Sequence, residues 1–378
     1  MIAALQTNAA PRVAIIGAGP VGCATAAFLH ERGIAAAIWS PTAHRVRQTG
    51  GGARIVTRGA LAVDFAPVLL QGAAELADYD LWLVCLPANA YESVLGEATR
   101  HWRDGHTVIV SGALSLAPLW LAEAAAAQGR DVLVAGWNTT ATTTHFLPDG
   151  ALHVNPLRER IEVAAGGARQ TAQAVARCES LLGPRFASAA NLLAITLANI
   201  NPIAHAAEVI PNLSRMDRGE DWSLFGCFTP VVARMAEALD AERLAVARAF
   251  GLALPTLREH YARSYHLTPA SLHEMAAEIV ARGMSPNGPA HLAHRYVLED
   301  APFGMAFLES LGRAAQVPTP VLTSCVTLLQ AIYARDFRAE NFLSAGLLPA
   351  GADSASLLAR CAAERSAEIS GRRALSVR

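Results

Sequence analysis

Two polar clusters stand out in the otherwise apolar C-terminal half of the chain. They are residues 199–205 (NINPIAH) and residues 295–304 (RYVLEDAPFG). Asn201 and His205 are four residues apart, so a helix places them on one face. Pro202 between them removes a backbone donor, which predicts a kink in that helix. A histidine that meets an aspartate, with an arginine nearby, is typical of a site that handles protons and carboxylates.

The same residues also have structural interpretations. Asp300 followed by Pro302 matches the start of a helix, with the aspartate as N-cap and the proline in the first turn. His205 taken alone is more typical of a hydrogen-bonded core histidine than of a catalytic one. The remaining histidines lack a spacing typical of metal ligands, so we expect no metal site.

A glycine-rich motif near the N-terminus predicts a dinucleotide site. Residues 12–16 (RVAII) form an apolar strand, GAGPVG follows, and a helical pattern from Val21 ends before Gly33. This order is typical of a Rossmann fold, in which the pyrophosphate binds at the N-terminus of the helix. In that fold the three glycines permit the tight turn, the approach of the pyrophosphate and close helix–strand packing. We therefore expect the cofactor to contact Gly17, Gly19, Pro20, Val21 and Gly22.

The end of the next strand, at residues 35–39, bears on the choice of cofactor. NAD sites usually have an acidic residue there for the ribose 2′-hydroxyl, but this strand is followed by Ser40. Arg45 and Arg47 lie in the loop beyond it and are suited to a 2′-phosphate. NADP(H) is therefore favoured over NAD(H). The alternative is that both arginines are solvated and Ser40 binds the ribose of NADH.

Strands and helices then alternate, which predicts an α/β fold with an N-terminal doubly wound parallel sheet. Loops at the carboxyl ends of such strands bind the ligands, so Pro87 should contact the cofactor, and Thr139 and Thr140 the substrate. From about residue 187 the apolar spacing is helical. We predict a Rossmann domain over residues 1–184 and an all-α substrate and catalytic domain over residues 185–378, divided at Gly183-Pro184.

The chain has no lysine, and its 31 basic residues are all arginine. This excludes a P-loop lysine, a Schiff-base lysine and reductases that use lysine as proton donor, including the short-chain and ketopantoate reductase types. Coding bias toward arginine is a sufficient explanation for the absence. Lysine-dependent mechanisms are excluded whether or not coding bias is the cause.

Bulk composition narrows the class of protein further. The 378 residues are 52% hydrophobic and 17% charged, with a formal net charge of −1. This balance predicts an ordered protein and gives no support for binding to nucleic acid or to an anionic membrane. No apolar run reaches a membrane-spanning length, and no signal peptide is recognisable. Six scattered cysteines indicate a reducing cytoplasm.

Taken together, GAGPVG, NINPIAH and RYVLEDAPFG resemble the octopine/nopaline (opine) dehydrogenase family, over essentially the whole chain. The resemblance implies a Rossmann domain, an α-helical domain and reductive joining of an amino acid to a 2-keto acid by NADH or NADPH. It implies that His205 is catalytic with Asp300 as its partner, that Arg295 holds a substrate carboxylate and that Asn201 positions substrate or His205. One branch makes opine metallophores such as staphylopine; the shorter length of this chain argues mildly against that branch.

The chemistry of the residues agrees with this resemblance. An imine or carbinolamine formed from the two substrates would accept a hydride, while arginine holds carboxylates and His205 manages protons. Two alternatives stay open: a 2-keto acid or ketone reductase with no amine partner, and a non-catalytic NADP(H)-binding sensor. A homodimer formed through the helical domain is a further expectation. The sequence does not specify the amino acid or the keto acid.

Overall fold

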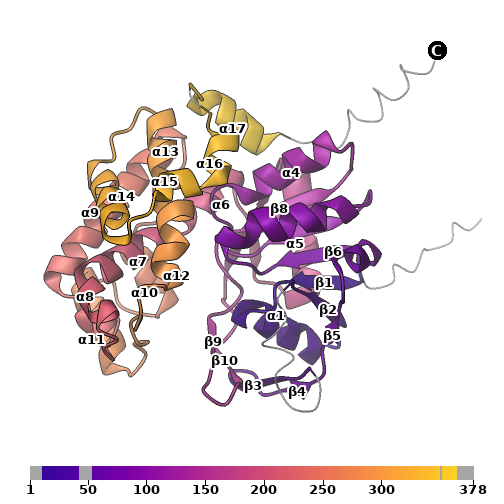
Figure 1. Cartoon of the computed structure of the whole chain (residues 1–378), viewed down its shortest axis with the longest axis horizontal. Coiled ribbons are helices and arrows are strands. Elements are labelled where there is room, and N and C mark those ends of the chain that lie inside the picture. Colours follow the sequence, from indigo (N-terminus) through magenta and orange to yellow (C-terminus); the bar gives the residue numbers. More distant parts are fainter. Residues whose placement is uncertain (1–10, 42–52, 350, 364–378) are drawn as a thin grey trace, which may run out of the picture.

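The computed structural model describes residues 11–41, 53–349 and 351–363. An α/β half is followed by a helical half, which lie side by side in Figure 1. This order confirms the predicted fold class.

The α/β half is built on one eight-stranded sheet with the order β12-β11-β8-β7-β6-β1-β2-β5. The six strands from β8 to β5 in this order are parallel, and the chain switches direction of winding between β1 and β6. The strands are β1 (Val13–Ile16), β2 (Ala36–Trp39), β5 (Val68–Leu69), β6 (Leu81–Val84), β7 (Thr107–Val110), β8 (Leu133–Trp137), β11 (Ile161–Ala165) and β12 (Phe186–Ser188). This is the strand order of a Rossmann fold, with the ligand crevice at the switch point.

A second, smaller sheet accompanies the main one. It has the order β4-β3-β10-β9 and consists of β3 (Ile55–Gly59), β4 (Asp64–Phe65), β9 (Thr144–Phe146) and β10 (Leu152–Val154). In chain order, β9 and β10 follow β8 and precede β11, and the two strands pair with each other in antiparallel fashion. Because no helical crossover links β8 to β11, β11 returns antiparallel to β8, unlike the strands before it.

Helices cover the main sheet, and shorter helical turns connect its strands. They are α1 (Pro20–Glu31), η1 (Ala73–Asp78), η2 (Ala88–Ala90), η3 (Tyr91–Leu95), α3 (Gly96–Ala98), η4 (Thr99–His101), α4 (Ala117–Ala127) and α5 (Ala168–Leu182). The predicted division at residue 184 needs correction, because β12 lies beyond it and pairs with β11. The sheet therefore ends at Ser188, and the helical half begins with α6.

The helical half contains no strand among its described residues, although Ser223 and Asn287 form an isolated bridge. Its helices are α6 (Leu192–Ala198), α7 (Asn201–Val209), η5 (Ile210–Asn212), α8 (Leu213–Asp217), η6 (Phe225–Cys227), α9 (Pro230–Ala249), α10 (Leu257–Ser264), α11 (Leu272–Ala281), α12 (Arg295–Leu298), η7 (Ala301–Ala306), α13 (Phe307–Ala314), α14 (Pro320–Tyr333), α15 (Phe337–Glu340), α16 (Phe342–Leu347) and α17 (Ser354–Ala362).

One helical stretch in the described part of the chain, Leu192–Asp217, is long and apolar enough to cross a membrane. It comprises α6 to α8, and 83% of its most apolar window is buried inside the protein. The core helix of a soluble protein meets the same criteria of length and composition. The stretch is interrupted at Asn199-Ile200, and α7 packs against α9.

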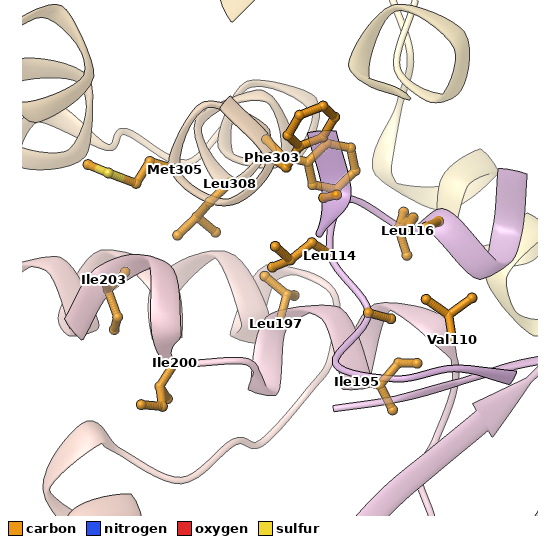
Figure 2. Packing of buried hydrophobic residues seen from close by; sticks show 14 of the residues in the cluster. Val110, Leu114, Leu116, Ile195, Leu197, Ile200, Ile203, Phe303, Met305 and Leu308 are labelled. Atoms are coloured by element: carbon orange, nitrogen blue, oxygen red, sulfur yellow. The ribbon is translucent and has the colours of Figure 1, made fainter. Parts of the chain in front are cut away.

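The two halves share one continuous apolar core. Figure 2 shows where the loop after β7 meets α6, α7 and the helix formed by η7 and α13. Buried side chains at this junction are Val110, Leu114, Leu116, Ile195, Leu197, Ile200, Ile203, Phe303, Met305 and Leu308. The segments that carry the two polar clusters are therefore packed against the loops at the carboxyl edge of the sheet.

A buried arginine on α9 stabilises the end of α6. Arg243 donates from Nη1 to the carbonyl of Leu197 at 2.7 Å, and it forms an ion pair with Asp240, also at 2.7 Å. The other oxygen of Asp240 accepts a hydrogen bond from the amide of Leu257. A helix end leaves carbonyls unpaired, and Arg243 supplies one of them with a charged donor. The chain can then leave α6 and begin α7 inside the core.

Candidate active site

Pro202 lies in the first turn of α7, which begins at Asn201. A proline there removes an amide that has no intrahelical partner anyway, so it fits without distorting the helix. The predicted kink is therefore wrong. The chain instead breaks between α6 and α7, where the Asn199 side chain accepts a hydrogen bond from the amide of Asn201 at 3.1 Å.

Close packing of Gly304 on Pro202 brings the two polar clusters together. A Cβ atom at Gly304 would lie 2.3 Å from Cγ and 2.4 Å from Cβ of Pro202. No side chain larger than hydrogen fits this contact without movement of one helix. The glycine of the second cluster thereby sets the distance between α7 and η7.

At that distance His205 and Asp300 meet. Nδ1 of His205 lies 2.7 Å from Oδ2 of Asp300, and the side chains are 12% and 1% exposed. Asp300 is the N-cap residue of η7 and Pro302 lies in its first turn, as the helix-start interpretation predicts, but the Asp300 carboxylate makes no capping hydrogen bond. Its other oxygen, Oδ1, is buried and has no hydrogen-bond partner among the described residues. The pair is oriented as a histidine and the carboxylate that fixes its tautomer.

Aromatic rings hold the imidazole of His205 in place. The ring of Tyr296 stacks on it with 3.5 Å between centroids, and His294 packs edge-on against Tyr296 at 4.5 Å. Burial, together with the nearby positive charges of His291, His205 and Arg295, lowers the pKa of His294 to about 4. Nε2 of His205 has no hydrogen-bond partner among the described residues and remains available to a substrate.

Glu208, three residues after His205 on α7, adds a buried acid that the sequence analysis missed. Its Oε1 accepts a hydrogen bond from the Tyr261 hydroxyl at 3.2 Å, and its Oε2 has no partner among the described residues. Burial raises the pKa of Glu208 to about 7, against the opposing effects of His205 and Tyr261. The sequence signal for Glu208 is that it is the one acidic residue of a mostly apolar helical run, residues 204–210 (AHAAEVI).

This raised pKa predicts that stability falls as pH rises. Between about pH 4.5 and 7 the folded protein keeps a proton on Glu208 that the unfolded chain releases. Over this pH range, the proton on Glu208 should therefore make the free energy of unfolding decrease by up to about 1.4 kcal/mol for each pH unit that is added. Glu208→Gln should remove that dependence, measured by urea unfolding at about pH 5 and about pH 7.5. Glu97→Gln, at an exposed position of α3, is the control; an equal pH dependence in wild type and Glu208→Gln would contradict the prediction.

Arg295 lies at the start of α12 and is half exposed, with 52% of its side chain accessible. Its Nε donates to Oε2 of Glu299 at 2.8 Å, and Oε1 of Glu299 accepts from the amide of Ala88 at 3.0 Å. Buried Glu299 thus connects Arg295 to the loop that follows β6. The terminal Nη atoms of Arg295 have no partner among the described residues and are free to bind a carboxylate. Glu299 was missed, although its i+4 spacing from Arg295 signals the pair.

The glycine motif forms the crevice at the switch point. Gly17 has φ of +118°, and a Cβ there would lie 2.4 Å from the carbonyl oxygen of Cys85. A Cβ at Gly22 would lie 2.0 Å from the oxygen of Gly17, whereas nothing lies within 4 Å of one at Gly19. Pro20 and Val21 begin α1, which has no acid in its first turn. This free helix N-terminus fits a pyrophosphate group.

Four of the other predicted ligand-contacting residues lie along the carboxyl edge of the sheet, Asn201 lies at the start of α7, and one pair is an exception. Ser40 follows β2, and Pro87 precedes η2 next to the crevice. Thr139 and Thr140 follow β8, where the oxygen of Thr139 accepts a hydrogen bond from the amide of Gly112. Asn201 is partly buried, and its side chain makes no hydrogen bond among the described residues. The exception is the pair Arg45 and Arg47, which lie outside the described residues.

Comparisons with known proteins agree with this architecture. Residues 188–333 match the model described as NAD/NADP octopine/nopaline dehydrogenase, alpha-helical domain, and residues 13–112 match that of ketopantoate reductase PanE/ApbA. A curated opine dehydrogenase from Arthrobacter sp. (strain 1C) is 30% identical over 334 residues, which cover 87% of this chain and 92% of that protein.

Solved structures show the same fold at low sequence identity. Octopine dehydrogenase with NADH and L-arginine is 15% identical, with a TM-score of 0.70, over 93% of this chain and 94% of the other. Yersinopine dehydrogenase with NADP+ bound is 16% identical, with a TM-score of 0.65, over 93% and 98%. Both halves of the chain and their arrangement are therefore those of known two-domain dehydrogenases.

Proposed function

The chain belongs to the opine dehydrogenase family, whose members are NAD(P)H-dependent oxidoreductases acting on CH–NH groups, and we propose that it joins an amino acid to a 2-keto acid. The amino group and the keto group condense with loss of water to a carbon–nitrogen double bond. When bound, the nicotinamide supplies a hydride to the carbon of that bond, and a proton completes the nitrogen. The product is an N-(carboxyalkyl) amino acid.

The observation that carries this proposal is the buried contact of His205 with Asp300 at the junction of the two halves. Nδ1–H of His205 donates to Asp300, which leaves Nε2 to accept or donate a proton at the reacting group. Arg295 binds the carboxylate of the keto acid through its free Nη atoms, and Asn201, one turn from His205, contacts the substrate.

The absence of lysine separates this site from a ketopantoate reductase site, although the N-terminal half matches that family model. A reductase that takes its proton from lysine is excluded for this chain. The remaining alternative enzyme is a keto acid reductase that uses the same histidine and aspartate without an amine. The two reactions differ in whether cofactor is consumed when no amine is present.

NADPH is the proposed hydride donor. β2 ends at Trp39, Ser40 follows it, and no acidic residue occurs from Ile34 to Val63 to hold a ribose 2′-hydroxyl. The motif loop and the free N-terminus of α1 would hold the pyrophosphate. We place the enzyme in the cytoplasm, which is consistent with its six scattered cysteines.

The test follows loss of NADPH or NADH absorbance with pyruvate, oxaloacetate or 2-oxoglutarate, each with and without pooled amino acids. Turnover that requires both partners is the expected result, with a higher kcat/KM for NADPH than for NADH. Splitting the pool then identifies the amine. Turnover with keto acid alone would replace the proposal by a hydroxyacid-type reductase. Tight cofactor binding without turnover on any pair would support the sensor alternative.

A further inference from the structure

A second arginine, which unlike Arg295 has no acidic partner among the described residues, lies at the boundary of the two halves. Arg158, between β10 and β11, donates from Nε to the carbonyl of Thr140 at 3.1 Å. No carboxylate of the described residues forms an ion pair with it, and its Nη atoms make no hydrogen bond there. Most arginines inside proteins are paired, because an unpaired buried charge is costly. An available guanidinium at this place therefore indicates a negatively charged ligand.

The backbone around Arg158 is held at several points. Its amide donates to the carbonyl of Ala141 at 2.9 Å, and its carbonyl accepts from Nη1 of Arg185 at 3.0 Å. Together with the bond from Nε to Thr140, these contacts fix the base of the side chain and leave the outer edge of the guanidinium open. A planar fork held in this way is suited to bidentate binding of a carboxylate.

The loop that carries Arg158 lies next to the helical half. Glu159 approaches His266, two residues beyond the end of α10, at 3.9 Å. Burial and then the charge of Arg158 lower the pKa of His260 on α10 to about 4. Arg158 also acts on the pKa of Tyr265, which directly follows α10. With its pKa at about 4, His260 is neutral at physiological pH and adds no charge to that of Arg158.

A series of contacts leads from Tyr265 to the helix that carries His205, the proposed catalytic histidine. Tyr265 packs edge-on against Tyr261 with 6.0 Å between centroids, and the Tyr261 hydroxyl donates to Glu208. Glu208 lies one turn from His205 on α7. On the other side, Arg158 holds Thr140, next to the Gly112 loop at the carboxyl edge of β7. Arg158 therefore contacts the sheet side of the site through Thr140, and its neighbour Glu159 approaches the helical side.

We propose that Arg158 binds the α-carboxylate of the amino acid substrate, while Arg295 binds that of the keto acid. This inference rests on the proposed function, whose product carries two carboxylates on either side of one nitrogen. Each carboxylate needs its own guanidinium. In both arginines only Nε is bound within the described residues, so each presents two free Nη groups.

The test compares the amino acid identified by the pool experiment with its carboxamide, which keeps the amine and the side chain but loses the charge. Wild type should prefer the acid, and Arg158→Gln should raise the KM for the acid about 10- to 100-fold. The KM for the carboxamide, the KM for the keto acid and the cofactor Kd should each change less than about threefold. Arg158→Lys should fall between wild type and Arg158→Gln, because it keeps the charge but loses the fork.

Arg160→Gln is the matched control, because Arg160 lies two residues away and is 60% exposed. It should behave as wild type. Equal losses for acid and carboxamide in Arg158→Gln, no loss for either, or a loss confined to the keto acid would overturn this inference and leave the proposed function intact. Turnover by wild type without any amine would overturn both.

Discussion

His205→Ala should lower kcat/KM by about 10²- to 10⁴-fold, because it removes the group proposed to transfer the proton at the reacting nitrogen. Asp300→Asn should lower kcat/KM by about 10- to 100-fold, since an amide does not fix the tautomer and orientation of the His205 imidazole as the buried carboxylate does. The double variant should be little worse than His205→Ala, because the two residues act as a unit. Steady-state kinetics with both substrates at varied concentration measures all three.

The cofactor provides the control for these variants. Neither side chain belongs to the glycine motif or its strand, so the Kd for NADPH should stay within about threefold of wild type in each. His101→Ala, in η4 of the α/β half, should leave both kinetics and binding unchanged. A large loss of cofactor affinity in both site variants would contradict their assignment to proton transfer.

Gly304→Ala should lower the free energy of unfolding by about 1–3 kcal/mol, since the new methyl group would overlap the ring of Pro202. Either α7 or η7 must then move. Because His205 lies on α7 and Asp300 directly precedes η7, that movement should lengthen their contact and lower kcat as well. Thermal and urea unfolding give the first effect, and saturation kinetics the second.

Gly96→Ala is the matched control for this substitution. Gly96 is also a helical glycine, but no atom lies within 4 Å of a Cβ built on it. Alanine there should be neutral or stabilising, by up to about 1 kcal/mol. If Gly304→Ala behaved in the same way, the packing of Pro202 on Gly304 would not set the separation of the two helices.

The order of elements in the α/β half was largely predictable from the sequence. Apolar strands and the GAGPVG turn have local signatures, since the pleat, the helix period and the conformational freedom of Gly17 depend on near neighbours. The prediction was less accurate where local rules allow two outcomes. Pro202 is typical of a kink or of a first turn, and only the break at Asn199-Ile200 selects the second. β11 reads as a strand in either direction, and the β9–β10 pair decides that it runs antiparallel.

What the sequence determined by itself is the set of chemical groups: a dinucleotide motif, His205 and Asp300, Arg295 and the absence of lysine. Tertiary structure decided which of them meet. The contact of His205 with Asp300 joins residues 95 positions apart and depends on the packing of Gly304 against Pro202. Glu299 reaches Ala88 across 211 positions, and Arg158 is held by the carbonyl of Thr140 and by Arg185, neither of them a near neighbour in sequence. Such contacts have no periodic signature in the chain, because they follow from how separate helices and loops share one buried core.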